Sequence, residues 1–158
     1  MTNLRLPFDR ITLAILAISL AGFSASGQEK KITEKSVPPA VINAFKAAYP
    51  SATIKGFARE KEHGKVFYEI ESKEGSTARD LLYNPDGSIA EIEETVAASD
   101  LPSSVQDVIR AKYAGAVITK AEKTTAGQTV SYEVIARKGK KRFTLEFDSD
   151  GNLKNKGS

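Results

Sequence analysis

An internal repeat constrains the fold of this chain more than any other feature. Shifting the sequence by 64 residues aligns residues 36–94 with residues 100–158 without a gap. The identical pairs include Pro38 and Pro102, Tyr49 and Tyr113, Tyr68-Glu69 and Tyr132-Glu133, and Asp86-Gly87 and Asp150-Gly151. Because helix, strand and turn residues are all in register, each half of the chain is expected to form the same supersecondary unit.

Each copy has the pattern of one helix followed by four strands. In the first copy Val41 and Phe45 recur at helical spacing, and Ser36 and Asp100 are the candidate N-caps of the two helices. Residues 66–71 then alternate with the period of a strand, and Asp-Gly, Glu-Gly and Lys-Gly pairs mark hairpin turns. Short connections between successive strands predict antiparallel pairing.

We therefore predict an α+β fold, a tandem duplication of a helix plus a four-stranded antiparallel sheet. A unit of about 60 residues buries only about 60% of its unfolded surface, so a single copy is marginally stable. The two copies are expected to stabilise each other in one eight-stranded sheet with both helices on one face. Two separate sheets packed through the connector at residues 95–100 are the alternative.

The first residues are typical of an export signal. Arg5 and Arg10 precede an apolar run of 13 residues (11–23), and small residues follow. A membrane-spanning helix needs about 20 apolar residues, so a cleaved signal peptide fits better and no membrane span is expected afterwards. The predicted organisation is a signal peptide (1–27), a linker (28–35), repeat 1 (36–99) and repeat 2 (100–158), in a periplasmic or secreted protein.

The composition excludes several classes of site. The chain has no cysteine and a single histidine, His63, so disulfide scaffolds, thiolate nucleophiles and Cys/His zinc sites are ruled out. We expect no catalytic residues, no metal site and no cofactor. The formal net charge of +3 is too small to indicate a nucleic-acid partner.

The repeated unit resembles the PepSY-like domains, and more closely the exported PepSY-like proteins grouped with the β-lactamase-inhibitor fold. The resemblance covers residues 36–158 and rests on short motifs: Tyr68-Glu69-Ile70, Asp86-Gly87, Tyr132-Glu133-Val134 and Asp150-Gly151. It implies non-enzymatic proteins such as peptidase pro-regions, protease regulators and inhibitors that dock a concave sheet on an enzyme. This chain lacks the inhibitors' disulfides and any long insertion hairpin, so inhibition of a β-lactamase is not expected.

Four other features are interpreted as structural. Asp148 begins a turn rather than a calcium loop, because no bidentate glutamate closes it. His63 lies in a charged turn without the apolar wall that shifts a pKa. Residues 137–142 form a basic hairpin, interpreted as solvated. Glu69 and Glu133 could suggest glycosidase chemistry, but ion pairs with basic residues on neighbouring strands are the simpler expectation: Lys65, Arg79, Arg137 and Arg142.

The sheet face away from the helices is the best functional candidate. Strand alternation places apolar and charged side chains together there, as in protein-binding surfaces. The candidate partner-binding face consists of Phe67, Glu69, Glu71, Leu82, Glu133, Ile135, Arg142 and Glu146. We predict a non-catalytic module that binds an unidentified protein or peptide, with a regulatory or inhibitory role toward an envelope or secreted protein such as a peptidase. The alternative is an envelope sensor or buffer that binds a small ligand or metal ion through Glu69, Glu71, Glu133 and Glu146.

Overall fold

The computed structural model describes residues 29–62 and 64–157. The expected signal peptide (1–27) and His63 lie outside the described residues. The helices are α1 (Pro39–Ala48), α2 (Ser103–Lys112) and the short 3₁₀ helices η1 (Glu34–Ser36) and η2 (Ala98–Asp100). The strands are β1 (Lys30–Lys31), β2 (Thr53–Glu62), β3 (Lys65–Glu74), β4 (Thr77–Tyr83), β5 (Ile89–Thr95), β6 (Val117–Ala126), β7 (Thr129–Lys138), β8 (Lys141–Asp148) and β9 (Leu153–Gly157).

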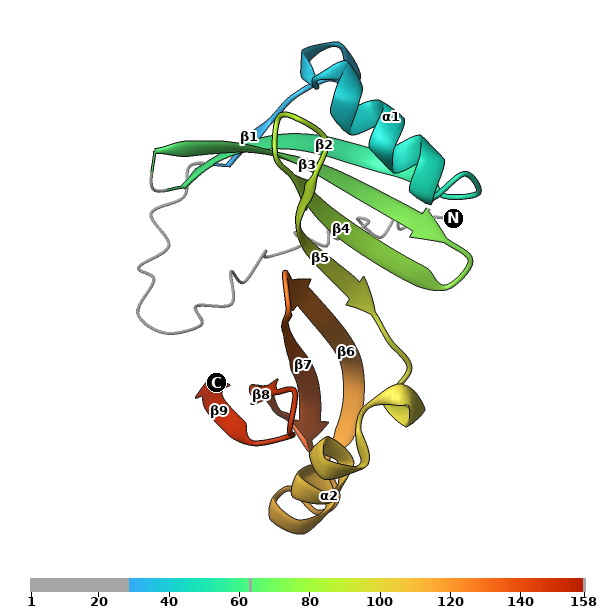
Figure 1. Cartoon of the computed structure of the whole chain (residues 1–158). Coiled ribbons are helices and arrows are strands. Elements are labelled where there is room, and N and C mark those ends of the chain that lie inside the picture. Colours follow the sequence, from blue (N-terminus) through green and yellow to red (C-terminus); the bar gives the residue numbers. More distant parts are fainter. Residues whose placement is uncertain (1–28, 63, 158) are drawn as a thin grey trace, which may run out of the picture.

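These strands form one antiparallel sheet in chain order, from β1 to β9. The two copies meet where β5 pairs with β6, with Glu93 opposite Thr124 and Thr95 opposite Glu122. Figure 1 shows a curved sheet with α1 at its upper end and α2 at its lower end. The predicted continuous sheet is therefore confirmed over the alternative of two separate sheets.

The sheet has nine strands instead of the eight expected. The additional strand is β1, in the segment predicted to be a linker, where Lys30 pairs with Arg59 and Lys31 with Ala58 of β2. A strand of two lysines at the edge of a sheet has no alternating pattern, so the sequence gives no local signal for it. Lysines on an edge strand also oppose pairing with another chain.

Both helices begin directly after a proline. Pro38 and Pro102 occupy the N-cap positions, and neither helix has a side-chain hydrogen bond at its cap. The prediction that Ser36 and Asp100 cap the helices was wrong, because both residues end the preceding 3₁₀ helices. Proline suits these sites because the first turn of a helix leaves its N–H groups unpaired in any case.

Each helix packs on the strands of its own copy. Val41 and Phe45 of α1 are at most 1% exposed and pack with Ile70, Leu81 and Tyr83. The equivalent core of the second copy consists of Leu101, Val105, Ile109, Ala121, Val134, Ala136, Phe143, Leu145 and Phe147. The molecule therefore has two equivalent cores joined by one sheet.

A glycine turn in each copy packs against the start of the helix of that copy. Gly87 (φ +87°) and Gly151 (φ +83°) both adopt the left-handed conformation. A side chain at Gly87 would lie 2.7 Å from the carbonyl oxygen of Ala40, and one at Gly151 would overlap Ser104. The 64-residue shift relates Gly87 to Gly151 and Ala40 to Ser104, so the repeat preserves a tertiary contact as well as its elements.

Candidate functional site

The side of the sheet away from the helices carries a large group of carboxylates. Ile92 and Ala121 pack in the two helix cores, so Glu93 and Glu122, next to them on β5 and β6, point to the opposite side. Glu60 and Glu62 of β2 face this side as well, and the register of β3 to β8 places eight central carboxylates on it. We call them the acidic face: Glu69, Glu71, Asp80, Glu91, Glu93, Glu122, Glu133 and Glu146.

Six of these carboxylates form two rows that run directly across the strands. In the first row Glu71 of β3 lies opposite Asp80 of β4, and Asp80 lies opposite Glu93 of β5. The second row crosses β6, β7 and β8 and consists of Glu122, Glu133 and Glu146. Like charges directly opposite each other destabilise a sheet, so the stability of the fold does not account for either row.

The two rows meet at the junction between the copies. The carboxyl group of Glu122 on β6 raises the pKa of Glu93 on β5 there, and Lys120 of β6 forms an ion pair with Glu122. The positive charge of Lys120 also lowers the pKa of Asp80 and of Glu133 relative to what burial alone would give. One lysine therefore supplies countercharge to both rows.

Several polar atoms of this side are buried without a hydrogen-bond partner among the described residues. Glu69 is 4% exposed, Glu133 is 6% exposed and Thr124 is 5% exposed. The unpartnered atoms are Oε2 of both glutamates and the hydroxyl oxygen of Thr124. An ionised carboxylate can only accept hydrogen bonds, and a buried acceptor without a donor destabilises a protein by about 1–3 kcal/mol. Because positions 69 and 133 are equivalent in the repeat, both copies carry this unmet acceptor.

The ion pairs expected for these two glutamates are absent from the described residues. Arg79, one of the expected partners, lies on the helix side of β4 together with Leu81. It pairs there with Glu74 at 3.1 Å and Glu94 at 3.3 Å, and its guanidinium carbon lies 5.1 Å from the centre of the Tyr49 ring. The expectation was wrong for Arg79 because side chains alternate between the two faces along β4, and Arg79 lies on the opposite face from Glu69.

Burial and repulsion from neighbouring carboxylates raise the pKa values of five residues of the acidic face: Glu69, Asp80, Glu91, Glu93 and Glu133. Burial raises the pKa of Glu69 to about 8, with Asp80 adding to the shift. Burial and the neighbouring Glu71 raise the pKa of Asp80 to about 6. Burial raises the pKa of Glu93 well above its usual range, and the adjacent Glu122 raises it further. At neutral pH this face therefore carries protonated as well as ionised carboxyl groups.

The structure places the other predicted binding residues on the same side. Phe67 and Leu82 are half-buried, Ile135 is 8% exposed and Arg142 is exposed. Leu82 lies between Glu69 and Glu91 in the register, so an apolar side chain interrupts the carboxylates of the first copy. Their contact with a partner stays a prediction.

The predicted binding face did not include five charged residues of this site: Glu91, Glu93, Lys120, Glu122 and Asp80. The alternation of Glu91 and Glu93 with Ile92 is a strand signal that could have revealed the first two. Lys120 and Glu122 follow an irregularity in the pairing of β6 between Ile118 and Lys120. Such a bulge changes which side of the sheet a residue faces, so alternation counted from the start of β6 assigns both residues incorrectly.

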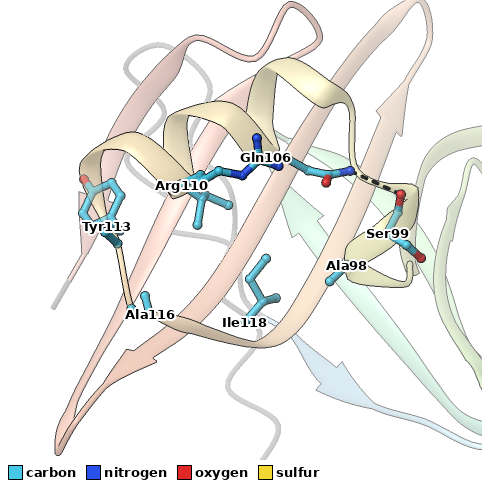
Figure 2. Close-up of a pocket in the computed structure, with 10 residues that line it drawn as sticks. Ala98, Ser99, Gln106, Arg110, Tyr113, Ala116 and Ile118 are labelled. Atoms are coloured by element: carbon cyan, nitrogen blue, oxygen red, sulfur yellow. Dashed lines mark hydrogen bonds between the residues drawn. The ribbon is translucent and has the colours of Figure 1, made fainter.

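A pocket of about 490 Å³ lies on the helix side of the second copy, between α2, η2 and the start of β6 (Figure 2). Gln106, Arg110 and Tyr113 project from the helix, and Ala98 and Ser99 lie opposite (Figure 2). The side-chain amide of Gln106 donates a hydrogen bond to the carbonyl oxygen of Ser99 at 3.3 Å. The sheet separates this pocket from the acidic face.

The first copy carries different side chains at the positions that line this pocket. Glu34 occupies the position of Ala98, and Lys46, which replaces Arg110, contacts its carboxylate at 3.5 Å. Ile42, which replaces Gln106, is 9% exposed. The two copies therefore differ in charge and polarity at the pocket-lining positions.

The Asp148 segment is a turn, as predicted. The carboxylate of Asp148 accepts backbone N–H bonds from Asp150 at 3.1 Å and Asn152 at 2.8 Å, and Lys154 pairs with it at 2.9 Å. These donors hold the pKa of Asp148 at about 2. Among residues 29–62 and 64–157, no three carboxylate or histidine side chains form a group that could hold a metal ion.

Comparison with known proteins defines the family. The sequence profile of the family described as "putative beta-lactamase-inhibitor-like, PepSY-like" matches residues 24–91 and again residues 75–155. This chain belongs to the PepSY-like family. This family match confirms the resemblance predicted from the repeat motifs. No curated protein matches the sequence.

Solved structures share this PepSY-like fold at low sequence identity. A putative periplasmic protein from Bacteroides eggerthii has a TM-score of 0.61 and 15% identity, covering 76% of this chain and 87% of its own. A BLIP-like protein from Bacteroides fragilis has a TM-score of 0.57 and 20% identity, covering 76% and 84%. These likenesses establish the fold of this PepSY-like chain. None of its described helices is long and apolar enough to cross a membrane.

Proposed function

We propose that this PepSY-like chain is an exported, non-catalytic module that binds a protein or peptide through the side of the sheet that carries the acidic face. The proposed contact residues are Phe67, Glu69, Glu71, Leu82, Glu133, Ile135, Arg142 and Glu146. Through this contact it regulates or inhibits an envelope or secreted protein such as a peptidase. The basic and apolar pattern of residues 1–27 and the periplasmic description of structural relatives support the export.

The observation that carries the proposal is the pair of like-charged rows on the unpacked side of the sheet. Carboxylates that face each other across strands reduce stability, and proteins retain such features where function requires them. Half-buried Phe67 and Leu82 lie among these carboxylates, and an apolar centre with polar surroundings is typical of protein-binding surfaces. The PepSY-like fold supports a binding role over catalysis.

The second candidate function is a sensor or buffer that binds a metal ion or small ligand. The unpartnered oxygens of Glu69 and Glu133 favour it, because carboxylate oxygens are the ligands that calcium prefers. It would use Glu69, Glu71, Glu133 and Glu146. We rank it second because Glu133 and Glu146 lie in the second copy, separated from Glu69 and Glu71 by β5 and β6.

Site-specific photo-crosslinking tests the leading proposal. A photoreactive amino acid is placed at Leu82, or at Thr144 opposite Ile135 on the proposed binding side. Asp107, on the exposed surface of α2, is the matched control position. After illumination of the producing cells, we expect a covalent adduct of one defined mass from Leu82 and Thr144, and none from Asp107. Mass spectrometry of the adduct then identifies the partner and its contacting segment.

The double variant Phe67→Asp and Leu82→Asp supplies an independent readout. It should abolish the adduct from Thr144, while a variant with two added carboxylates on α2, Ala111→Asp and Lys112→Asp, should keep it. Adducts from Asp107 alone, or adducts from Thr144 that survive the face variant, would contradict the proposal.

A further inference from the structure

We propose that the acidic face binds a cationic segment of the partner, with arginine or lysine side chains placed beside the carboxylates at the junction of the copies. This inference rests on the proposed function and adds the chemistry of the partner. It concerns Glu93, Glu122 and Thr124 at the β5–β6 junction, together with Glu69 and Glu133 on either side.

The unmet hydrogen-bonding capacity of the face is the first argument. Oε2 of Glu69, Oε2 of Glu133 and the hydroxyl oxygen of Thr124 are buried without a partner, and each of these residues is more than nine-tenths buried. All three lie on the side of the acidic face, from β3 to β7. Acceptors of this kind need donors, and a guanidinium presents five N–H donors and no acceptor.

The balance of charge is the second argument. Eight carboxylates occupy the face, and Lys120 alone forms an ion pair with one of them among the described residues, Glu122. Lys120 shows that a cation can bind at this face, because its ammonium group lies beside the carboxyl groups of Glu93 and Glu122. A partner that brings further cations would neutralise the remaining carboxylates and replace repulsion by attraction.

The spacing of the carboxylates along each strand defines the shape of the cationic segment. Glu69 and Glu71 lie two residues apart on β3, and so do Glu91 and Glu93 on β5. Side chains two residues apart on a strand are separated by about 7 Å. An extended peptide with a cation at every second residue has the same repeat, so its basic side chains can reach successive carboxylate positions.

Calorimetric titration with a defined peptide tests this inference on the mature full-length protein. The probe is an acetylated and amidated Arg-Ala-Arg-Ala-Arg peptide, and the matched control replaces each arginine by citrulline, which keeps the shape and removes the charge. At low salt and pH 7.5 we expect saturable binding of the arginine peptide and none of the citrulline peptide. Binding should tighten at pH 8.5 and weaken at pH 5.5, because more carboxyl groups are ionised at the higher pH.

Three variants locate the binding site. The double variant Glu93→Gln and Glu122→Gln should weaken binding at least tenfold. Lys120→Met should tighten it several-fold, since it removes the internal competitor for the same carboxylates. The control variant Glu34→Gln and Asp107→Asn changes two carboxylates on the helix side and should leave the affinity unchanged. A merely structural role of these charges would not produce opposite effects from Lys120→Met and the junction variant.

Several outcomes would overturn the inference. These are equal binding of the citrulline peptide, arginine-peptide binding that the junction variant does not change, or saturable stabilisation by calcium or magnesium without any peptide binding. Crosslinking from Leu82 and Thr144 that persists without peptide binding would overturn only the cationic partner and would leave the proposed function standing. If neither the crosslinking from Leu82 and Thr144 nor the peptide binding is observed, both proposals are overturned.

Discussion

Arg79 connects strands and helix in the first copy. Its side chain, 16% exposed, pairs with Glu74 on β3 and Glu94 on β5 and stacks over Tyr49, the residue that ends α1. Three elements therefore meet at one guanidinium, whose planar group can serve two carboxylates and an aromatic ring together. In the second copy the equivalent position holds Phe143, which packs against Tyr113 with ring centres 5.2 Å apart.

Arg79→Met should lower the free energy of unfolding by about 1–3 kcal/mol, because it leaves Glu74 without its partner and leaves Glu94 with Lys123 at 3.9 Å alone. Arg110→Met is the matched control. Its side chain is 74% exposed and contacts only Asp107 on the same helix among the described residues, so the expected loss is below about 0.5 kcal/mol. Urea unfolding followed by circular dichroism measures both, and equal losses would show that Arg79 does not connect these elements.

The glycine turns determine how each hairpin meets its helix. Gly87 before β5 and Gly151 before β9 combine a positive φ with close approach to the start of a helix. By contrast, Gly139 in the β7–β8 turn has φ +60°, and a Cβ added there would meet no atom within 4 Å. Gly87 and Gly151 are therefore required for close packing against the helices as well as for the turn conformation.

Gly151→Ala should destabilise the protein by about 2–4 kcal/mol, since the new methyl group adds overlap with Ser104 to the unfavourable left-handed backbone. Gly139→Ala should destabilise it by about 1 kcal/mol, from the backbone alone. The difference between the two melting temperatures isolates the contact between turn and helix. If Ser104→Gly in the Gly151→Ala background restores no stability, the overlap is not the cause.

The continuous sheet makes the whole molecule respond to pH. It brings carboxylates from both copies to one side, and burial raises the pKa values of Glu69 and Asp80 to about 8 and about 6. These values exceed those of the unfolded chain, so between about pH 4 and pH 8 the folded protein binds more protons than the unfolded one. The contribution of these groups to stability is therefore fully present at low pH and is lost as the pH rises.

The free energy of unfolding should fall by about 5 kcal/mol between pH 5 and pH 8.5 from Glu69 and Asp80 together. The variant Glu69→Gln, which cannot ionise, should show a smaller fall and be more stable than the original protein at pH 8.5. Urea titrations at pH 5, 7 and 8.5 measure the trend, with Glu34→Gln as the control on the exposed surface. A free energy of unfolding that stays constant or rises across this range would show that the acidic face ionises in the folded protein without loss of stability.

Much of the architecture could be predicted because it depends on local patterns. The repeat, the helical spacing of Val41 and Phe45, and the alternation around Tyr68 are each visible within a few residues. The same alternation placed Phe67, Glu69, Glu133 and Glu146 on one side of their strands. The β1 strand could not be predicted, because its pairing with β2 depends on a partner far along the chain rather than on a pattern of its own.

The sequence by itself determined the number of copies, their element order and the family. Only the tertiary structure decided what the carboxylates contact. Whether Glu93 meets Glu122, whether Arg79 reaches Glu69, and whether Lys120 faces the acidic side all depend on register between strands and on a bulge in β6. Register is set by long-range pairing and burial, and a shift of one residue reverses the side that every residue of a strand faces. For that reason the acidic face became visible only when the two copies were joined in one sheet.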